Sequence, residues 1–362
     1  MTEADSYGRR AALQGPPGEW QICPPNEVGL TQVIMDAIEP RISAWTAANV
    51  HTIVMCRYGK LAYEHYFCGE DECWGIPVGL VKYDAHLKHD LRSITKSIVS
   101  LLFGIAIDQG WVEHLDLPVI AALPDYASAN ATDLRRVTLR HLLSMTAGFE
   151  WNESLPYGDA TNSERKMTDA PDRCRYVLSQ PITRPPGSAY VYNGGLTTVL
   201  AGVLVSASGR PLDVLANEML FEPLGISDVE WIRYADGTPN AASGLRMRAR
   251  DLAKIGQMVL NGGRWGRKPI VSQSWITQST SAQIEAGGSL CYGLHWWTGQ
   301  SLVDRKDVRW IAAIGYGGQR MFIVPSLDLL VIVLAGMYSN RELSTAVGET
   351  ILGDYVLRAT VK

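Results

Sequence analysis

Segments typical of β-strands lie near both ends of this chain, and the region between them is mainly helical. Near the N-terminus, residues 51–56 and 60–67 flank a Tyr58-Gly59 turn. Near the C-terminus, strands are expected at residues 293–297, 308–313, 320–324 and 329–334. The turn at residues 325–328 makes the last two an antiparallel hairpin. One antiparallel sheet built from both termini, flanked by helices and interrupted by a helical insertion, is an α+β architecture.

This pattern predicts how the chain divides. Residues 1–28 form an N-terminal arm, residues 29–92 and 245–362 form a discontinuous sheet domain, and residues 93–244 form a mainly helical domain. The active site is expected at the interface of the last two. Residues 68–90 look like a loop. Helices are expected at residues 30–48, 137–145, 197–206, 211–221, 250–260 and 341–357, and directly after Ser93.

The bulk composition excludes several classes of function. The 362 residues are 46% hydrophobic and 19% charged, which is enough apolar material for a sizeable core. A net charge of -4 gives no reason to expect nucleic acid. No apolar run reaches the roughly 18 residues of a membrane span. The polar start of the chain lacks the features of a secretory signal, so a cytoplasmic location with free thiols is expected.

The histidines and cysteines form no recognisable metal motif. His65, Cys68 and Cys73 lie close together, but a fourth ligand and a second C-x-x-C pair are missing. His86 and His89 are interpreted as ordinary polar residues ahead of Ser93. We therefore expect neither a metal nor an organic cofactor.

Ser93 and Lys96 open a long apolar stretch that ends near Gly110. Residues three apart share one face of a helix, so Lys96 can bring its amine to the Ser93 hydroxyl. The helix N-terminus can polarise a group under attack, and together these features describe an activated serine. The alternative is that Ser93 is an N-cap and Lys96 a solvated residue of the first turn. Ser163 and Lys166 share the spacing, but no apolar helix follows them.

Two glycine-rich segments accompany this pair. Residues 186–195 form a turn cluster that contains Tyr190 and Tyr192, and residues 315–319 read Gly-Tyr-Gly-Gly-Gln between two expected strands. Glycines in such places allow the backbone to approach a ligand closely.

In this order the three segments resemble the serine β-lactamase and penicillin-binding-protein superfamily, for which S-x-x-K is a signature. The branch of class-C-like hydrolases and esterases, which includes the 6-aminohexanoate-dimer hydrolases, is the most similar. The resemblance covers roughly residues 45 to 350. It extends to three further stretches, at residues 138–148, 221–226 and 242–247.

The resemblance implies roles for individual residues. Ser93 is the nucleophile, Lys96 its base and Tyr192 the tyrosine of the Y-x-N element, with Tyr190 as a rival. The backbone amides of Ser93 and Gln319 form the oxyanion hole. Asn193 directly follows Tyr192, and Gly194 stands where the family has its usual Asn. Tyr316 replaces the Lys or His of the third element, so efficient β-lactamase activity is not expected.

The resemblance further implies a serine hydrolase that cleaves amide or ester bonds of small molecules through an acyl-enzyme on Ser93. Lys96 is expected to be kept neutral by burial and to accept the serine proton. Asn193, Tyr316, Gly318 and Trp151 are the predicted substrate-binding residues, although the loop of Trp151 is equally readable as plain surface.

Three functions stay open: an amidase similar to the aminohexanoate-dimer hydrolases, a carboxylesterase, and a catalytically weak penicillin-recognising binding protein. The expected partner is a small molecule, without nucleic acid or membrane. A homodimer is left open.

Overall fold

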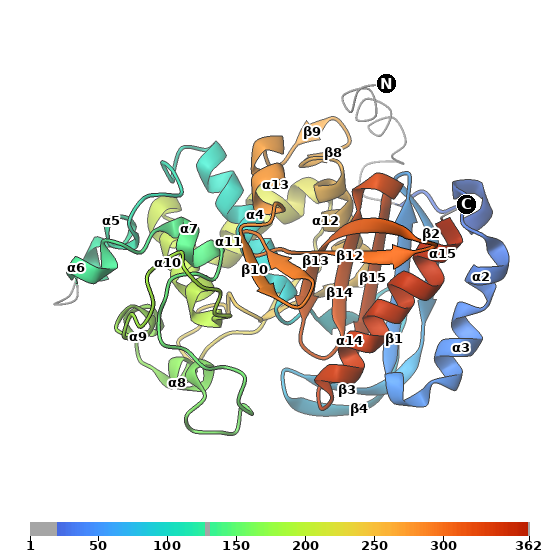
Figure 1. Ribbon diagram of the computed structural model, residues 1–362, viewed down its shortest axis with the longest axis horizontal. Helices are drawn as coiled ribbons and strands as arrows, with labels where there is room; N and C mark the ends of the chain where they lie inside the picture. Colours follow the sequence, from blue (N-terminus) through green and yellow to red (C-terminus); the bar gives the residue numbers. More distant parts are fainter. Residues whose placement is uncertain (1–19, 127–130, 361–362) are drawn as a thin grey trace.

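The computed structural model describes residues 20–126 and 131–360, and its centre is an eight-stranded antiparallel sheet with the order β10-β11-β12-β13-β14-β15-β1-β2 (Figure 1). Two N-terminal strands therefore pair with the C-terminal ones. The strands are β1 (Val50–Arg57), β2 (Lys60–Tyr66), β10 (Ile284–Gly287), β11 (Leu290–Tyr292), β12 (Trp297–Val303), β13 (Lys306–Gly315), β14 (Gln319–Val324) and β15 (Leu329–Ala335).

Helices cover both faces of this sheet, and each face has its own core. Successive side chains of a strand point to opposite faces. On β1, Val54 and Cys56 accordingly join one apolar cluster, whereas Ile53 and Met55 join the other. The first cluster includes helices α4 (Ile94–Asp108) and α12 (Ala249–Leu260). The second includes α2 (Gln32–Asp36), α3 (Ile38–Ala44) and α14 (Arg341–Thr350), which form the outer layer in Figure 1.

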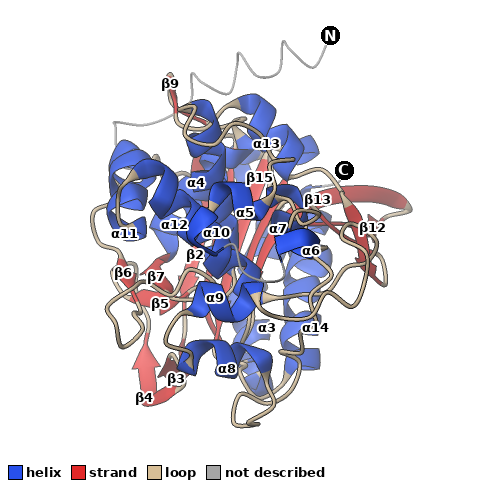
Figure 2. Ribbon diagram, turned by 90° about the vertical axis from the view of Figure 1, so that its left-hand side faces the viewer, coloured by secondary structure: helices blue, strands red, loops and turns tan. Residues whose placement is uncertain are grey.

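A mainly helical region lies on the α4 side of the sheet, and Figure 2 views the molecule from that side. Its central helix is α10 (Gly194–Ser208), which packs on α4. The other helices around it are α5 (Val119–Ala122), α6 (Ala131–Leu134), α7 (Leu139–Leu143), α8 (Ser163–Asp169), α9 (Arg173–Leu178) and α11 (Leu212–Ala216). Helix α13 (Gln273–Ser279) packs on α4.

The predicted sheet from both termini is confirmed. The predicted hairpin at residues 320–334 is confirmed as β14 and β15, with Val324 opposite Leu329. The strand expected at residues 293–297 is wrong in position, because β11 ends at Tyr292 and β12 begins at Trp297. Positive φ at His295 interrupts the extended backbone between them.

The loop expected at residues 68–90 is also wrong. This segment forms the hairpin of β3 (Cys68–Cys73) and β4 (Ile76–Lys82), followed by β5 (Lys88–Asp90). Strand β5 pairs with β7 (Leu245–Arg248), which also pairs with β6 (Glu230–Trp231). The hairpin is largely exposed and rich in charge and Gly, so it lacks the apolar alternation by which a strand is recognised.

Three predicted helices are interrupted. The helix expected at residues 211–221 passes from α11 into a π-helical segment, Asn217–Phe221. The helix expected at residues 30–48 breaks near Ala37 into α2 and α3. The C-terminal helix continues from α14 into a π-helical segment, Ile351–Leu357. Residues 1–19 of the predicted arm lie outside the described residues, whereas the Cys23 amide donates to the Leu61 carbonyl of β2. The division into domains at residues 28, 92 and 244 stays a proposal.

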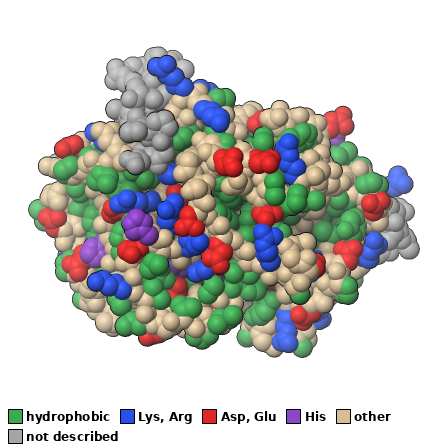
Figure 3. Space-filling view, turned by 180° about the vertical axis from the view of Figure 1, so that it is seen from behind, with side chains coloured by type: hydrophobic (Ala, Val, Ile, Leu, Met, Phe, Trp, Pro, Cys, Tyr) green, Lys and Arg blue, Asp and Glu red, His purple; other side chains and the backbone are tan. Residues whose placement is uncertain are grey.

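The surface is mixed in charge. On the face seen in Figure 3, Lys and Arg side chains are interspersed with Asp and Glu rather than gathered in one patch. Within residues 20–126 and 131–360, no single helix has both the length and the apolar character to cross a membrane. Only the pair Gly194–Ser208 and Leu212–Leu224, bent by 78°, meets that requirement jointly.

Candidate active site

Ser93 is positioned by a sharp connection between β5 and α4. The Leu91 amide donates to the Leu245 carbonyl at 2.9 Å, which extends the β5–β7 pairing up to the turn. Arg92 then adopts a left-handed conformation with φ of 50°, and Ser93 follows at the N-cap position of α4. The Ser93 side chain makes no capping hydrogen bond. Its hydroxyl is therefore not committed to the helix end, as the N-cap alternative would require.

Lys96 points its amine at that hydroxyl. The Lys96 Nζ lies 2.9 Å from Ser93 Oγ and 2.9 Å from the Ala242 carbonyl oxygen. The side chain is 2% exposed, so the alternative of a solvated lysine is wrong. The rival pair differs: the Ser163 hydroxyl accepts the Asn152 amide, and Lys166 is exposed. Only the first of the two S-x-x-K matches therefore forms a serine–lysine pair.

Tyr192 completes the cluster. Its ring lies 5.0 Å from Lys96 Nζ, and its hydroxyl hydrogen-bonds with Ser93 and Lys96. The rival Tyr190 packs its ring against Tyr292 and Trp297, and its buried hydroxyl has no partner among the described residues. Tyr192, not Tyr190, is thus the tyrosine in contact with the serine–lysine pair.

Asn193 is buried, and its side chain accepts the Leu196 amide as the N-cap of α10. That hydrogen bond fixes the start of the helix directly behind Tyr192.

Two carboxyl groups, those of Glu153 and Glu164, raise the pKa of Lys96. A Cβ built on Gly194 would lie 3.3 Å from Glu153 Oε2 and 3.6 Å from Glu164 Oε1. The Gly194 amide and the Trp151 indole both donate to Glu153 at 2.7 Å. Desolvation and the neighbouring Glu153 raise the pKa of Glu164 to about 7. The site therefore holds a carboxyl group that titrates near neutral pH.

The expectation that burial keeps Lys96 neutral is wrong. Burial does lower the pKa of Lys96, but Tyr192, Glu153 and Glu164 outweigh it, and the net direction is upward. For Tyr192, desolvation raises the pKa more than the Lys96 charge lowers it. The resting pair is accordingly a lysine ammonium beside a neutral phenol. The two carboxyl groups come from a distant loop and helix, so no local motif announced them.

The glycine-rich loop between β13 and β14 lies against the Ser93 segment. A Cβ on Gly315 would fall 2.3 Å from the Leu91 carbonyl oxygen, and Gly318 has a positive φ of 101°. The Gln319 side chain is tied to the Tyr316 and Ala335 carbonyls, which fixes the loop. In the described part of the chain, the Ser93 amide donates to no other group, so it is free to bind an oxyanion.

Two other predicted substrate-binding residues, Tyr316 and Trp151, lie in different surroundings. Tyr316 is half exposed, and its hydroxyl donates to the Tyr338 carbonyl. Trp151 is 8% exposed and packs beneath α10, where a Cβ on Gly195 would lie 2.8 Å from its ring. Trp297 stacks on Tyr192 with ring centroids 6.3 Å apart.

The sequence reasoning missed Glu164 and His295. His295 is buried, its Nε2 lies 3.0 Å from Thr197 Oγ1, and burial together with the Lys96 charge lowers its pKa to about 3.

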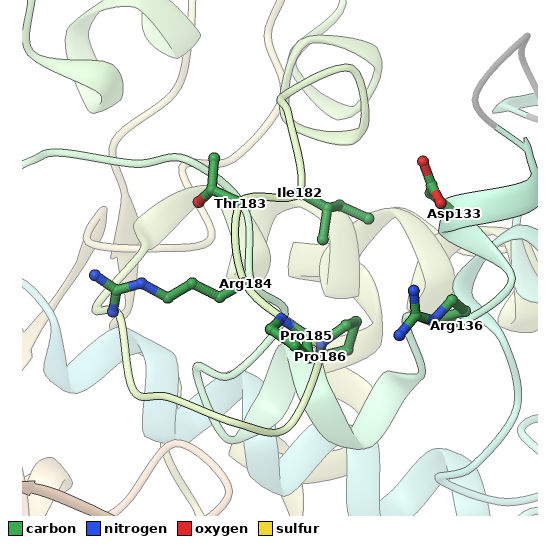
Figure 4. A pocket seen from close by; sticks show the side chains of 7 residues that line it. All are labelled: Asp133, Arg136, Ile182, Thr183, Arg184, Pro185 and Pro186. Carbon is green, nitrogen blue, oxygen red and sulfur yellow. The ribbon is translucent and has the colours of Figure 1, made fainter.

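A separate surface hollow carries none of this chemistry. It is lined by Asp133, Arg136, Ile182, Thr183, Arg184, Pro185 and Pro186 (Figure 4). None of the serine, lysine and tyrosine of the cluster borders it.

His65, Cys68 and Cys73, for which no metal site is expected, do not bring their ligand atoms together in the described residues. In residues 20–126 and 131–360, the histidine and acidic ligand atoms that do converge belong to His51, Asp71 and His89. The six cysteines are free.

Comparison with known proteins places this geometry in context. A family model described as Beta-lactamase matches residues 52–347. A 6-aminohexanoate-dimer hydrolase from Paenarthrobacter ureafaciens is 24% identical over 268 residues, which cover 68% of this chain and 66% of that protein. Esterase EstB from Burkholderia gladioli is 27% identical over 212 residues, covering 54% and 52%. The match thus spans about two thirds of the length of the dimer hydrolase and about half of the length of the esterase.

Solved structures are similar in fold. EstCE1, a hydrolase with promiscuous acyltransferase activity, has a TM-score of 0.69 at 18% identity, covering 87% of this chain and 98% of that one. A class C beta-lactamase has a TM-score of 0.66 at 15% identity, covering 89% and 96%. At such identities the likeness establishes the fold alone.

Proposed function

We propose, from the premise that this chain belongs to the beta-lactamase family, that it is a serine hydrolase that cleaves amide or ester bonds of small molecules through an acyl-enzyme on Ser93. The observation that carries the proposal is the 2.9 Å contact between Lys96 Nζ and Ser93 Oγ at the start of a buried helix. Relatives named as a dimer hydrolase and an esterase support both bond types.

Acylation begins with the loss of one proton from the pair of Lys96 and Tyr192. The pair then accepts the proton of Ser93 while its Oγ bonds to the substrate carbonyl carbon. The bond from that carbon to the leaving nitrogen or oxygen breaks, and Tyr192 passes the proton to the leaving group. Water then attacks the acyl carbon and gives a proton to the same pair. The bond from that carbon to Ser93 Oγ breaks, the acid leaves, and the pair returns the proton to Ser93 Oγ. No step needs a metal or an organic cofactor.

The negative charge that develops on the carbonyl oxygen is held by the backbone amides of Ser93 and Gln319. Removing one such donor typically costs a few kcal/mol of transition-state stabilisation. The Gly315–Leu91 approach supports this assignment, because it brings the loop before Gln319 next to the Ser93 segment.

The substrate is proposed to lie between the Tyr316 loop and the aromatic side of the site. Tyr316 and Gly318 border it on one side, with Trp151 and Asn193 on the other. Because Tyr316 carries no charge, recognition of a substrate carboxylate is weak, which favours small acyl esters and linear amides over penicillins. The protein is further proposed to act in the cytoplasm, as a monomer or a homodimer.

Steady-state turnover of matched small-molecule substrates tests the proposal. The wild type should hydrolyse a p-nitrophenyl ester or the matched anilide, and Ser93→Ala should be inactive. Ser163→Ala is the control and should retain activity, since its S-x-x-K match forms no pair. Ligand binding without turnover in the wild type would instead favour a penicillin-recognising binding protein. Full activity of Ser93→Ala would contradict the mechanism.

A further inference from the structure

A second group of titratable side chains has no part in the proposed mechanism. His51 of β1 and His89 of β5 are fully buried, and Asp71 of β3 is 9% exposed. Their ligand atoms all lie within 4.8 Å of one another. We propose that His51 Nδ1, His89 Nε2 and a carboxylate oxygen of Asp71 bind one zinc ion.

The hydrogen bonds around the two imidazoles fix their tautomers. The Asn49 amide nitrogen donates to the Glu70 and Gly336 carbonyls, so Asn49 Oδ1 is the atom that faces His51. His51 Nε2, 3.2 Å away, must donate to it. His89 Nδ1 likewise donates to the Asp90 carbonyl at 2.9 Å. His51 Nε2 and His89 Nδ1 thus each carry the ring proton. A hydrogen bond from the nitrogen that does not bind the metal commonly orients a histidine ligand.

The other two ring nitrogens, His51 Nδ1 and His89 Nε2, therefore face each other with their lone pairs. His51 Nδ1 and His89 Nε2 are 2.9 Å apart, and neither neutral ring has a second N–H to donate. Two facing acceptors repel unless a cation lies between them.

Asp71 supplies the negative charge. Its carboxylate oxygens lie 3.9 Å from His51 Nδ1 and 3.9 Å from His89 Nε2. Tetrahedral zinc ligands at about 2.0–2.1 Å from the ion lie roughly 3.3 Å apart, so small movements close the site. Asp71 Oδ2 accepts the Tyr83 hydroxyl, whereas the buried Oδ1 accepts no hydrogen bond from the residues that the structure describes. An unpartnered buried carboxylate oxygen is costly without a cation.

The residues around His51 pack closely against its ring. A Cβ on Gly69 would lie 2.3 Å from Asn49 Oδ1 and 2.8 Å from the His51 ring. A Cβ on Gly336 would lie 2.7 Å from the same ring. Tyr83 stacks on His51 with centroids 4.6 Å apart. The imidazole is thus clamped in one orientation, as a metal ligand requires.

Imidazole nitrogen and carboxylate oxygen form a donor set that suits zinc, with a water in the fourth position. The ligands join three elements: the central sheet, the β3–β4 hairpin and the strand that leads into Ser93. The ion would therefore hold the hairpin to the sheet beside the start of α4. Its role is structural, because none of the three ligands takes part in the proposed mechanism.

Zinc binding to the full chain tests this proposal. Protein stripped with a chelator, returned to zinc and desalted should hold about one equivalent and unfold at a higher temperature than the stripped protein. His89→Gln and Asp71→Asn should each hold less than about a tenth of that amount. His86→Gln, which changes an exposed histidine three residues away, is the control and should hold about one equivalent.

A second readout needs no variant. Cobalt in place of zinc should give the visible absorption of a four-coordinate site without a thiolate charge-transfer band. Substoichiometric zinc in the wild type would overturn the proposal and leave a proton shared by the two imidazoles. Zinc retained by His89→Gln but lost in Cys68→Ser would place the ion on the exposed thiol and would overturn it too.

Discussion

At the scale of single residues, the proposed chemistry depends on how one proton is distributed over Ser93, Lys96 and Tyr192. The ammonium of Lys96 is favoured at rest, because Tyr192, Glu153 and Glu164 together raise the pKa of Lys96 by more than burial lowers it. The form with one proton fewer, which activates Ser93, is therefore the minor form near neutral pH. Its share grows as the pH rises, so kcat/KM should increase toward alkaline pH.

Tyr192→Phe should lower kcat by about 10²- to 10⁴-fold, because the substitution removes the group that passes the proton to the leaving group. Tyr190→Phe is the matched control. It removes a hydroxyl that has no partner in the described residues and should change kcat by less than about twofold. Steady-state kinetics with one ester substrate compares the two, and the reverse order of effects would assign the role to Tyr190.

Glu164→Gln should shift the rising limb of the pH profile of kcat/KM to lower pH. The Glu164 charge raises the pKa of Lys96, so its removal lets Lys96 lose its proton at a lower pH. Asp169→Asn, on the exposed side of the same helix, should leave the limb unchanged. If the rising limb stays at the same pH in Glu164→Gln, the Glu164 carboxyl does not control the pKa of Lys96.

At the scale of elements, the site depends on a close approach between two backbones. The end of β13 meets the β5–α4 connection at Gly315, where the Leu91 carbonyl leaves no space for a side chain. We propose that this contact aligns the amides of Ser93 and Gln319 in the oxyanion hole.

Gly315→Ala should lower kcat by about 10- to 100-fold, because its Cβ forces the two backbones apart and displaces one oxyanion donor. Gly353→Ala is the control, since its Cβ would meet nothing within 4 Å. Circular dichroism should show both variants folded. Unchanged kcat in Gly315→Ala would mean that the loop does not position the donor.

Elements differ in how much of them the sequence predicts. Strand β15 is one continuous apolar run, and α4 is dense in apolar residues at helical spacing, so both are recognisable without tertiary information. Hairpin β3–β4 is not, because Glu70, Glu72 and Gly79 remove the alternation that marks a strand. The pairing of β3 with β4 is seen only in the structure.

At the scale of the whole molecule, the central sheet joins N-terminal and C-terminal strands. Strand β15 lies between β14 and β1, and its Ile332 faces Val54 on one side and Met321 on the other. The helical region packs on one face of this sheet, which places α4, and with it Ser93, between the two.

Ile332→Ala should lower the free energy of unfolding by about 2–5 kcal/mol, because it opens a cavity in a fully buried strand. Leu302→Ala, on the same sheet at 72% exposure, should change it by less than about 0.5 kcal/mol. Denaturant unfolding measures both. Equal effects would contradict the observed burial.

Helical spacing paired Lys96 with Ser93, the resemblance to the β-lactamase superfamily added Tyr192, and the three do come together. The carboxyl of Glu164 and the cluster of His51, Asp71 and His89 could not be predicted. Their members are widely spaced in the chain and meet only when strands and helices pack. Local patterns report a helix face or a strand, but not which distant side chains share a buried space.

The most direct test of the central claim is the intact mass of the protein after treatment with a fluorophosphonate. The account predicts one adduct on the wild type, one on Ser163→Ala and none on Ser93→Ala. An adduct of equal yield on Ser93→Ala would contradict Ser93 as the activated nucleophile.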